Sequence, residues 1–510
     1  KFFDVVTYTG NGTTQSIAHN LGSTPGFVMV KGTSLSSDWR CFHRSTPTGY
    51  FYLNATDALE TTSAANNFGN NSTVVAPTST TLTVGSGGAL NGSGQTYVAY
   101  LFAHDAGGFG LTETENVISC GTGTWNGSGV SSVTLGYEPQ WVMIKSATSA
   151  HGWWMVDNMR GMPATSDGQQ LNAEGNYAES TSSLVARPTA TGFTTGNGAA
   201  SQTYIYIAIR RGPMAVPTDG TKVFTPATRT GDGTTSVNVT NATFPVDLAI
   251  GRGRSTSAPT PTWIDRLRGA TRQLRSDNAD AEAASTIMSS LASQTGWIGS
   301  TGGSGSWNTS SVNYIQWYMR RAPNFFDEVC YTGTGVARTV SHNLAAVPEL
   351  MIVKCRSNVI DGWMVYVAAL PATSKMILNR DYAELAGETT TWNSTRPTAS
   401  VFSVGTEANV NNSGYTYVAY LFATCAGVSK VGSYTGTGAA QTINCGFTGG
   451  ARFVLIKRTD STGDWYVWDS ARGIIPSNDP YLLINTVDAE TTGTDYVDTT
   501  NVGFDITSTA

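Results

Sequence analysis

Hydrophobic and polar positions alternate with a period of two in short runs along this chain. Runs rich in β-branched and aromatic residues, such as Thr96–Ala103 and Thr416–Ala423, are separated by clusters of Gly, Asn, Ser and Thr. Alternation of this kind indicates β-strands, and turn clusters about every 8–15 residues are typical of β-sandwiches and barrels. The pairs Asn11-Gly12 and Asp232-Gly233 suit tight hairpin turns, because both positions tolerate positive φ. The pattern predicts an all-β protein.

The chain repeats itself with a period of about 105 residues, long enough for each copy to bury a core of its own. The opening Phe2–Asp4 with Val28–Lys31 returns as Phe325–Asp327 with Met351–Lys354, and each complete copy ends on a hydrophobic strand. We number five expected modules along the chain. They are module 1 (residues 1–106), module 2 (111–213), module 3 (221–322), module 4 (324–425) and module 5 (430–510). Module 5 stops before its closing strand, and both ends look cut from a longer array.

Each module is expected to be a β-sandwich of the jelly-roll or lectin-like kind. Its closing strand carries aromatics on both faces and few charges, so we expect it to be central in a sheet and buried on both sides. A stretch with Leu-Asn followed by Ala-Glu recurs in mid-module, and its residues suit a short capped helical turn. The stretches are Leu53–Glu60, Leu171–Glu179, Leu274–Glu282, Leu378–Glu384 and Ile484–Glu490.

Composition narrows the classes of function. The chain is 13% charged, where a typical domain has roughly 25%, and its net charge is −6. A chain with this net charge has no excess of positive residues for binding nucleic acid or an anionic membrane surface, so neither partner is expected. The longest apolar run, Tyr97–Ala103, is far shorter than the ~20 residues that span a bilayer, so no membrane insertion is expected. The 13 Trp, 21 Tyr and 18 Phe supply the apolar area that disordered chains lack.

One glutamate recurs in every module, as Glu60, Glu179, Glu282, Glu384 and Glu490. A glycosidase needs two carboxylates flanking one bond, with pKa values pushed apart. No second acid recurs with the same regularity, and five catalytic copies in one chain are improbable. We therefore expect these glutamates to cap turns.

Three modules carry Trp, then Asp, then Arg-Gly at the end of an expected strand. The sets are Trp153, Asp157 and Arg160-Gly161; Trp263, Asp265 and Arg268-Gly269; Trp465, Asp469 and Arg472-Gly473. A local Asp–Arg pair that holds a turn is the role we expect. The alternatives are a contact between modules or with a ligand. Modules 1 and 4 lack the pattern, which argues against a universal functional role.

Histidines and cysteines offer no recognisable reaction centre. His19 and His342 occupy equivalent positions, whereas His43, His104 and His151 have no counterparts. Neither H-x-x-x-H nor C-x-x-C spacing occurs, and no G-x-S-x-G elbow marks a serine nucleophile. Cys120 and Cys330 share a position filled elsewhere by Thr7, Thr228 and Ser433, which indicates a small packed site. Reduced thiols fit assembly in a cytoplasm. We expect no catalytic residues, metal or cofactor, and the sequence identifies no binding residues.

The module opening resembles repeats of uncharacterised virion proteins of tailed bacteriophages and prophages. The similar residues are Phe325–Asp327, Tyr331–Gly335, His342–Leu344 and Pro348–Lys354, with the closing Tyr417–Ala423. Val428–Gly473 is particularly similar, although Gly449-Gly450-Ala451 replaces the Pro-Glu turn. The resemblance implies a non-enzymatic tail fibre or other appendage of the virion, assembled in the host cytoplasm, that contributes to host attachment.

The partners expected for such a protein are other virion proteins, a bacterial surface glycan or protein receptor, and further copies in a homo-oligomer. An extracellular adhesin or sheath-like surface protein is the alternative. A polysaccharide-cleaving tailspike is less favoured, because it needs a cleft with paired carboxylates that the sequence does not show.

Overall fold

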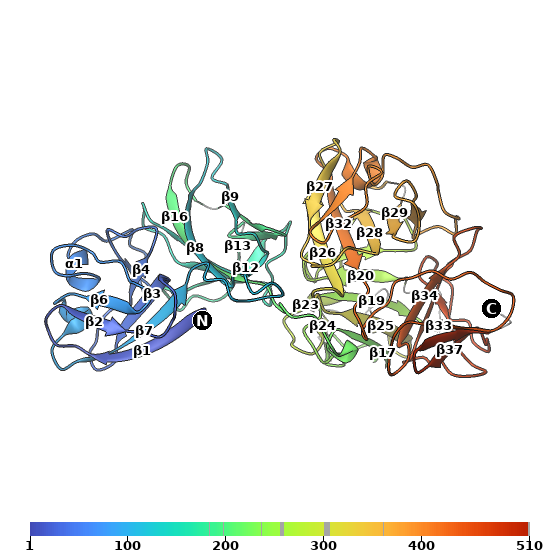
Figure 1. The fold of residues 1–510 in the computed structure, drawn as a ribbon, viewed down its shortest axis with the longest axis horizontal. Coiled ribbons are helices and arrows are strands. Elements are labelled where there is room, and N and C mark those ends of the chain that lie inside the picture. Colours follow the sequence, from blue (N-terminus) through green and yellow to red (C-terminus); the bar gives the residue numbers. More distant parts are fainter. Residues whose placement is uncertain are drawn as a thin grey trace. The chain divides into compact units, whose positions relative to one another are not determined.

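The computed structural model describes residues 1–182, 184–196, 198–235, 237–254, 260–299, 307–360 and 362–507. It confirms an all-β protein built from separate antiparallel sheets, consistent with an array of sandwich modules (Figure 1). The chain forms two compact units. Unit 1 comprises Lys1–Met162 and Ser166–Met214, and unit 2 comprises Pro163–Thr165 and Ala215–Ala510. The predicted boundaries between modules remain predictions.

Module 1 shows the plan that the other modules vary. Its main sheet has the strand order β1-β7-β3-β4-β5, and β2 pairs with β6 in a small second sheet. The strands are β1 (Phe3–Thr9), β2 (Gln15–Ala18), β3 (Pro25–Gly32), β4 (Arg40–His43), β5 (Phe51–Tyr52), β6 (Thr81–Val84) and β7 (Thr96–Ala103), and the helices are α1 (Ala64–Asn67) and α2 (Gly88–Asn91). Val28 and Leu101 of the main sheet pack with Leu82 and Val84 of the small sheet in one buried core.

Unit 1 continues with module 2. Its main sheet has the order β13-β12-β11-β10-β16-β8, and its second sheet the order β14-β15-β9. The strands are β8 (Ile118–Thr124), β9 (Ser131–Thr134), β10 (Pro139–Ser146), β11 (Trp154–Asp157), β12 (Gly168–Asn172), β13 (Ser180–Ser182), β14 (Arg187–Thr189), β15 (Gly192–Thr195) and β16 (Thr203–Arg210).

Unit 2 begins with module 3, whose sheets have the orders β17-β25-β19-β20-β21-β22 and β18-β24-β23. Its elements are the 3-10 helix η1 (Gly220–Lys222), β17 (Phe224–Thr230), β18 (Asn238–Val239), β19 (Leu248–Gly253), β20 (Thr262–Asp265), β21 (Arg272–Arg275), β22 (Ala283–Ala284), β23 (Met288–Ser290), β24 (Trp297–Gly299) and β25 (Asn313–Met319).

Modules 4 and 5 complete unit 2. Module 4 has the sheets β26-β32-β28-β29-β30 and β27-β31, and module 5 has β34-β35-β36 and β33-β38-β37. The elements of module 4 are β26 (Phe326–Thr332), β27 (Arg338–Ser341), β28 (Leu350–Cys355), β29 (Trp363–Val367), β30 (Met376–Ile377), β31 (Val401–Val404), α3 (Ala408–Asn411) and β32 (Thr416–Phe422). Those of module 5 are β33 (Gln441–Asn444), β34 (Phe453–Lys457), β35 (Trp465–Asp469), β36 (Leu482–Leu483), β37 (Val497–Thr500) and β38 (Gly503–Ile506).

The closing strand is central in its sheet, as predicted. β7, β16, β25 and β32 each lie between the first strand of their module and the strand that carries the repeated Lys or Arg. The prediction of burial on both faces is confirmed for the middle of β16, β25 and β32. It is wrong for β7, in which every second residue is only half-buried.

The predicted mid-module helical turns are absent from the described residues. Leu53–Glu60 forms a turn followed by irregular backbone, and the corresponding stretches of the other modules are also non-helical. In modules 1, 3, 4 and 5 a backbone N–H of the stretch reaches a neighbouring module. The N–H of Glu282, for example, donates to Arg356 O (2.8 Å), and that of Glu384 donates to Thr459 O (2.8 Å). The stretches are only seven to nine residues long and have no apolar stripe to bury as a helix, so an isolated helical turn is not stable there.

The outer faces of the main sheets pack against one another. In unit 1, one hydrophobic cluster joins Phe27, Cys41 and Phe51 of module 1 to Cys120 and Ile207 of module 2. In unit 2, one cluster combines side chains of modules 3, 4 and 5, among them Trp317, Tyr420 and Val467. The main sheets of unit 2 are therefore buried on the inside by their own module and on the outside by neighbours, whereas in unit 1 only part of each outer face is covered.

Candidate functional site

The most regular polar contacts in the molecule lie at the junctions between modules. The repeated lysine at the end of β10, β28 or β34 donates to a backbone carbonyl of the preceding module. The bonds are Lys145 to Thr56 O (2.9 Å), Lys354 to Ala279 O (2.9 Å) and Lys457 to Asp381 O (3.1 Å). Burial lowers the pKa of Lys145 and of Lys354 to about 8, although nearby carboxylates oppose the shift. In modules 2, 4 and 5 this lysine therefore contacts the preceding module.

A tryptophan opposite this lysine makes a second contact of the same kind. The indole N–H of Trp153 donates to Tyr52 O (2.8 Å), that of Trp363 to Arg275 O (3.0 Å) and that of Trp465 to Ile377 O (3.2 Å). Cross-strand pairing explains the recurrence, because Lys354 faces Trp363 and Lys457 faces Trp465 across their hairpins. We call the surface that supplies these donors the donor face and the surface that receives them the acceptor face.

The junctions of unit 2 form a closed cycle. Module 4 donates to module 3, and module 5 donates to module 4. Module 3 donates to module 5 through Arg252, which replaces the lysine and bonds Thr486 O (3.2 Å) and the carbonyls of Leu483 and Asp488. Among the described residues of unit 1 there is a single junction, at which module 2 donates to module 1.

The repeated Asp and Arg form the local ion pair that the sequence predicted. The distance from Arg Nε to the Asp carboxylate is 2.6 Å in Asp157–Arg160 and in Asp469–Arg472, and Asp265 and Arg268 bond in the same way. The Asp also accepts the backbone N–H of its Arg, and the Arg donates to a carbonyl of the preceding strand. The prediction that this pair holds a turn is confirmed.

The same pair also takes part in the junctions, which was the alternative reading. The Tyr420 hydroxyl of module 4 donates to Asp265 of module 3 (2.7 Å), and the Trp317 indole of module 3 donates to Asp469 of module 5 (3.0 Å). Tyr420 and Trp317 occupy the same place in their closing strands. Sequence reasoning named a contact between modules as an alternative but did not identify Tyr420 and Trp317 as its donors, although the two aromatics stand at matching positions of the repeat.

The recurrent glutamates belong to this network. Glu179, Glu282 and Glu490 lie 3.2–3.4 Å from the Arg of the motif in their own module. Two are also held by an arginine from the neighbouring module, since Arg356 bonds both carboxylate oxygens of Glu282 and Arg254 both of Glu490, at 2.7–2.9 Å. Burial would raise the pKa of Glu282, but the bond from Arg356 and the charges of Arg268 and Arg356 lower it overall.

The other two glutamates have simpler surroundings. Glu60 accepts the backbone N–H of Thr62 (2.5 Å), as a turn cap does, and Glu384 contacts module 5 through its backbone. Sequence reasoning missed Arg254 and Arg356, which follow the repeated cation by two positions in modules 3 and 4 only. An alignment of the modules with one another would have shown these two arginines at the same position.

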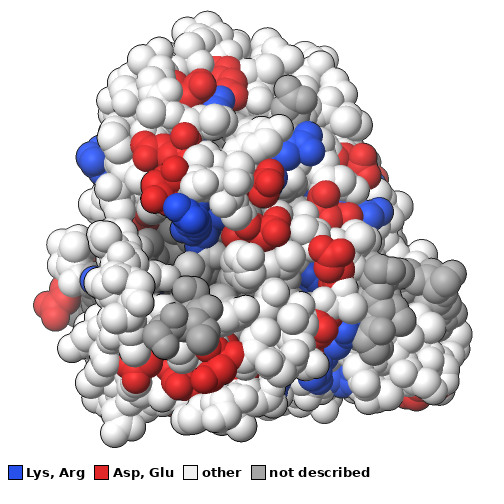
Figure 2. Space-filling model, turned by 90° about the vertical axis from the view of Figure 1, so that its right-hand side faces the viewer, with Lys and Arg blue, Asp and Glu red and all other residues white. Residues whose placement is uncertain are grey.

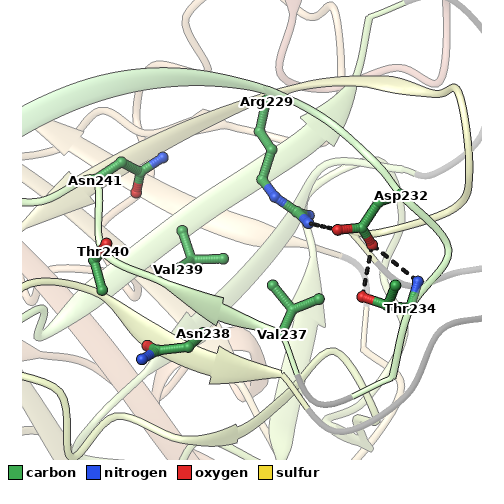
Figure 3. A pocket seen from close by; sticks show the side chains of 8 residues that line it. All are labelled: Arg229, Asp232, Thr234, Val237, Asn238, Val239, Thr240 and Asn241. Atoms are coloured by element: carbon green, nitrogen blue, oxygen red, sulfur yellow. Dashed lines mark hydrogen bonds and ion pairs between the residues drawn. The ribbon is translucent and has the colours of Figure 1, made fainter.

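A surface hollow of about 520 Å³ lies on module 3 between Arg229, the Asp232–Thr234 turn and residues 237–241 (Figure 3). Asp232 accepts the backbone N–H and the hydroxyl of Thr234 (2.9 and 2.7 Å) and faces Arg229 at 3.5 Å. The bonds from Thr234 and from the amide of Asn308 lower the pKa of Asp232 to about 2. Asn11 caps the matching turn of module 1, so the charged group in the hollow serves the turn.

The histidines support the backbone. The Nδ1 of His342 accepts the N–H of Leu344 (3.3 Å), so its Nε2 donates to Thr398 O (3.1 Å), and His19 makes the matching pair of bonds. His43 bonds Tyr206 O across the junction of unit 1, and burial lowers its pKa to about 4. Both equivalent histidines therefore stabilise a strand-to-turn corner.

The six cysteines are free thiols in the structure. Cys120 is fully buried, and Cys330 lies 3.6 Å from a guanidinium nitrogen of Arg356. Burial raises the pKa of both thiols, to about 12 for Cys330. Their packing agrees with the small packed site expected from the sequence.

Within the described residues, no three His, Cys, Asp or Glu side chains gather as a metal site. The same part of the chain contains no helix with the length and hydropathy needed to cross a membrane. A family model described as "Domain of unknown function (DUF7483)" matches residues 2–213 and 219–510, so the gap between the two matches falls where unit 1 gives way to unit 2. No curated protein matches the chain.

Proposed function

The chain belongs to the family of domains of unknown function DUF7483, and we propose that it is a structural protein of a tailed-bacteriophage particle. In this proposal it forms a tail fibre or related appendage and contributes to host attachment. Its partners are other virion proteins and a bacterial surface glycan or protein.

The closed cycle of junctions in unit 2 is the observation that supports a structural role for this protein. Each junction devotes the same repeated cation to the neighbouring module, and buried Asp–Arg–Glu clusters reinforce two of the three. Asp265, Arg268, Asp469 and Arg472 have fully buried side chains, so these carboxylates are committed to arginine and closed to a substrate. The most regular polar groups of the chain thus hold modules together, which supports a structural role over a catalytic one.

The assignment to a phage particle rests on the resemblance of the repeat, and the surface is compatible with it. Figure 2 shows one face on which positive and negative side chains are dispersed over a mostly uncharged surface. A surface of this kind limits non-specific electrostatic adhesion.

Electron microscopy tests the proposed location. Antibodies raised against the purified chain are applied to phage particles from a lysogen or lysate that carries the gene, and binding is detected with gold particles. Label on the tail or its fibres supports the proposal. Label on the surface of uninfected cells would favour the adhesin alternative and contradict it.

Adsorption measurements test the attachment role. Purified chain added before the phage should compete for the receptor and reduce adsorption in proportion to its concentration. Heat-denatured chain at the same concentration is the control, and it should not compete if the receptor binds the folded surface. Release of reducing ends from host polysaccharide, abolished by replacing a single Asp or Glu, would instead reveal a tailspike enzyme.

A further inference from the structure

The donor face of module 1 is uncovered, although its counterparts elsewhere are buried. Tyr100 is half-buried, whereas Tyr420 and Trp317 at the same place in β32 and β25 are 0% exposed. Val5 is 46% exposed, and its counterpart Glu328 is 0% exposed. The same change from buried to half-buried separates Met29 from Ile352, Lys31 from Lys354, Trp39 from Trp363 and Val98 from Val418.

Trp39 and Lys31 of module 1 are arranged like the residues that form a junction in module 4, but no module of the described chain lies against them. Val30 pairs with Arg40, and the same register continued by one residue brings Trp39 opposite Lys31, as Trp363 lies opposite Lys354. Its carbonyl accepts the N–H of Leu53 (3.1 Å), as the carbonyl of Trp363 accepts that of Leu378 (2.9 Å). Lys31 donates only to Ser37 O of its own hairpin within the described chain, whereas Lys354 reaches module 3.

The acceptor face of module 2 is open in the same way. The side chains of Asp157 and Arg160 are 22% and 23% exposed, whereas those of Asp265 and Arg268 are 0% exposed. Glu179 is 42% exposed, against 10% for Glu282. The stretch 175–180, which corresponds to the acceptor stretches of modules 3 and 5, is exposed throughout.

We propose that unit 1 is two-thirds of a cycle, and that one further module of this repeat, supplied by a partner polypeptide, docks between the donor face of module 1 and the acceptor face of module 2. The junctions of unit 2 define its chemistry. Asp265 and Asp469 are matched by Tyr420 and Trp317, so the partner's closing strand presents a tyrosine or tryptophan to Asp157. It also presents an arginine to Glu179, as Arg356 and Arg254 do to Glu282 and Glu490.

The partner completes the other side of the cycle with backbone carbonyls. Its strand equivalent to β30 and the loop that follows accept the indole of Trp39 and the ammonium of Lys31, as Ile377 and Asp381 accept Trp465 and Lys457. The apolar side chains of Val5, Met29, Val98 and Tyr100 are buried against it. Burial of this area and the formation of both sets of bonds drive the docking.

A second copy of the chain does not fit this position. Its unit 1 would bring two modules to a place for one, and the additional module would occupy the space of module 1 or module 2 of the first copy. Its modules 3, 4 and 5 have their donor and acceptor faces engaged with one another. The occupant is therefore a single module with both faces free.

Hydroxyl-radical footprinting of the full chain tests the open face. Trp39, Met29 and Tyr100 should be oxidised, whereas the internal references Trp363 and Tyr420 should be protected. Equal protection of Trp39 and Trp363 in a monomer would overturn the proposal. Protection that rises with protein concentration, together with a dimeric mass in ultracentrifugation, would make a second copy the occupant and also overturn it.

Addition of a module tests the occupant. The probe is the full chain with an extra copy of residues 324–425 joined ahead of Lys1 by a flexible Gly/Ser linker, which gives a high effective concentration. This sequence carries Tyr420 and Arg356 for module 2 and the carbonyls of Ile377 and Asp381 for module 1. Oxidation of Trp39 and Tyr100 should fall to the level of Trp363.

The matched control carries Tyr420→Phe and Arg356→Ala in the added copy alone, and it should leave Trp39 more reactive than the unaltered fusion does. Circular dichroism shows whether the added module is folded. If it is not, an added copy of residues 1–106, which carries Tyr100, replaces it. A folded added module of either sequence that leaves the oxidation of Trp39 unchanged would overturn the proposal.

Discussion

The closing strands of modules 1 and 4 have one sequence and two environments. Thr96–Ala103 and Thr416–Ala423 are identical, and both strands are interior, each the second strand of a five-stranded sheet. In module 4 every residue from Tyr417 to Leu421 is buried, whereas Val98 and Tyr100 of module 1 are half-buried. The inner face is covered by the module itself, but the outer face is covered only where another module supplies its acceptor face. Burial of that face is thus a property of the neighbour.

Buried ion pairs show the same difference between the two units. Asp265–Arg268 is sealed by Tyr420 of the next module, whereas Asp157–Arg160 in unit 1 has the same local geometry and a partly exposed surface. The Asp and Arg of the sequence motif form the ion pair by themselves. Whether a neighbouring module packs on the pair determines how far it is exposed to water. The following measurements compare groups that a junction buries with counterparts that are more exposed, or with the unchanged chain.

Removal of the motif arginine should give the largest difference. Arg268→Ala leaves Asp265 buried without its cation, and we expect it to destabilise unit 2 by about 3–5 kcal/mol. Arg160→Ala breaks a partly exposed pair and should cost unit 1 about 0–1 kcal/mol. Denaturant titration followed by hydrogen exchange in peptides of each unit measures both values. Equal losses would show that the junction does not seal the pair.

Removal of a single hydroxyl should have a smaller effect. Tyr420→Phe deletes the bond to Asp265 and should cost unit 2 about 1–3 kcal/mol, because the carboxylate loses a partner in a buried site. Tyr100→Phe in the identical strand of module 1 should change stability by less than about 0.5 kcal/mol. The same exchange measurement compares the two variants. A loss of similar size for Tyr100→Phe would show that its hydroxyl already has a buried partner.

Acidification should weaken unit 2 through Glu282. Its folded pKa is lowered, so its stabilising contribution is complete above the unfolded pKa of about 4.3 and is lost as the pH falls through the lower folded value. We expect Glu282→Gln to be less stable than the natural chain at neutral pH and to lose less stability on acidification below about pH 4. Denaturant midpoints at a series of pH values measure this. Parallel curves for the two proteins would contradict the prediction.

Lysine reactivity should differ without any change in stability. Lys31 is half-buried, whereas Lys145 and Lys354 are fully buried at junctions. An amine-reactive reagent at neutral pH should therefore modify Lys31 first, and peptide mass spectrometry gives the order. Modification of Lys354 as fast as Lys31 would show that its junction opens readily.

Local sequence patterns predicted the interior of each module well. The period of two predicted the strands, and the uncharged aromatic closing strand predicted its central position, because both depend on pairing within about 105 residues. The spacing of Asp157 and Arg160 likewise predicted a turn that the two residues can form by themselves. The helical turn predicted for Leu53–Glu60 was wrong, because so short a stretch has no apolar stripe to bury as a helix, and its Leu59 N–H bonds Ala147 O of module 2.

What the sequence by itself determined is the module: its strands, its core and the repeated positions of lysine, tryptophan, aspartate and arginine. Only the tertiary structure decided which of those positions face a neighbour. Trp39 and Trp363 stand at one place in the repeat, yet one is half-exposed and the other is buried against module 3. A strand pairs through contacts that its own segment encodes, whereas the cover of its outer face depends on residues of a different module. That cover is settled only when the modules pack together.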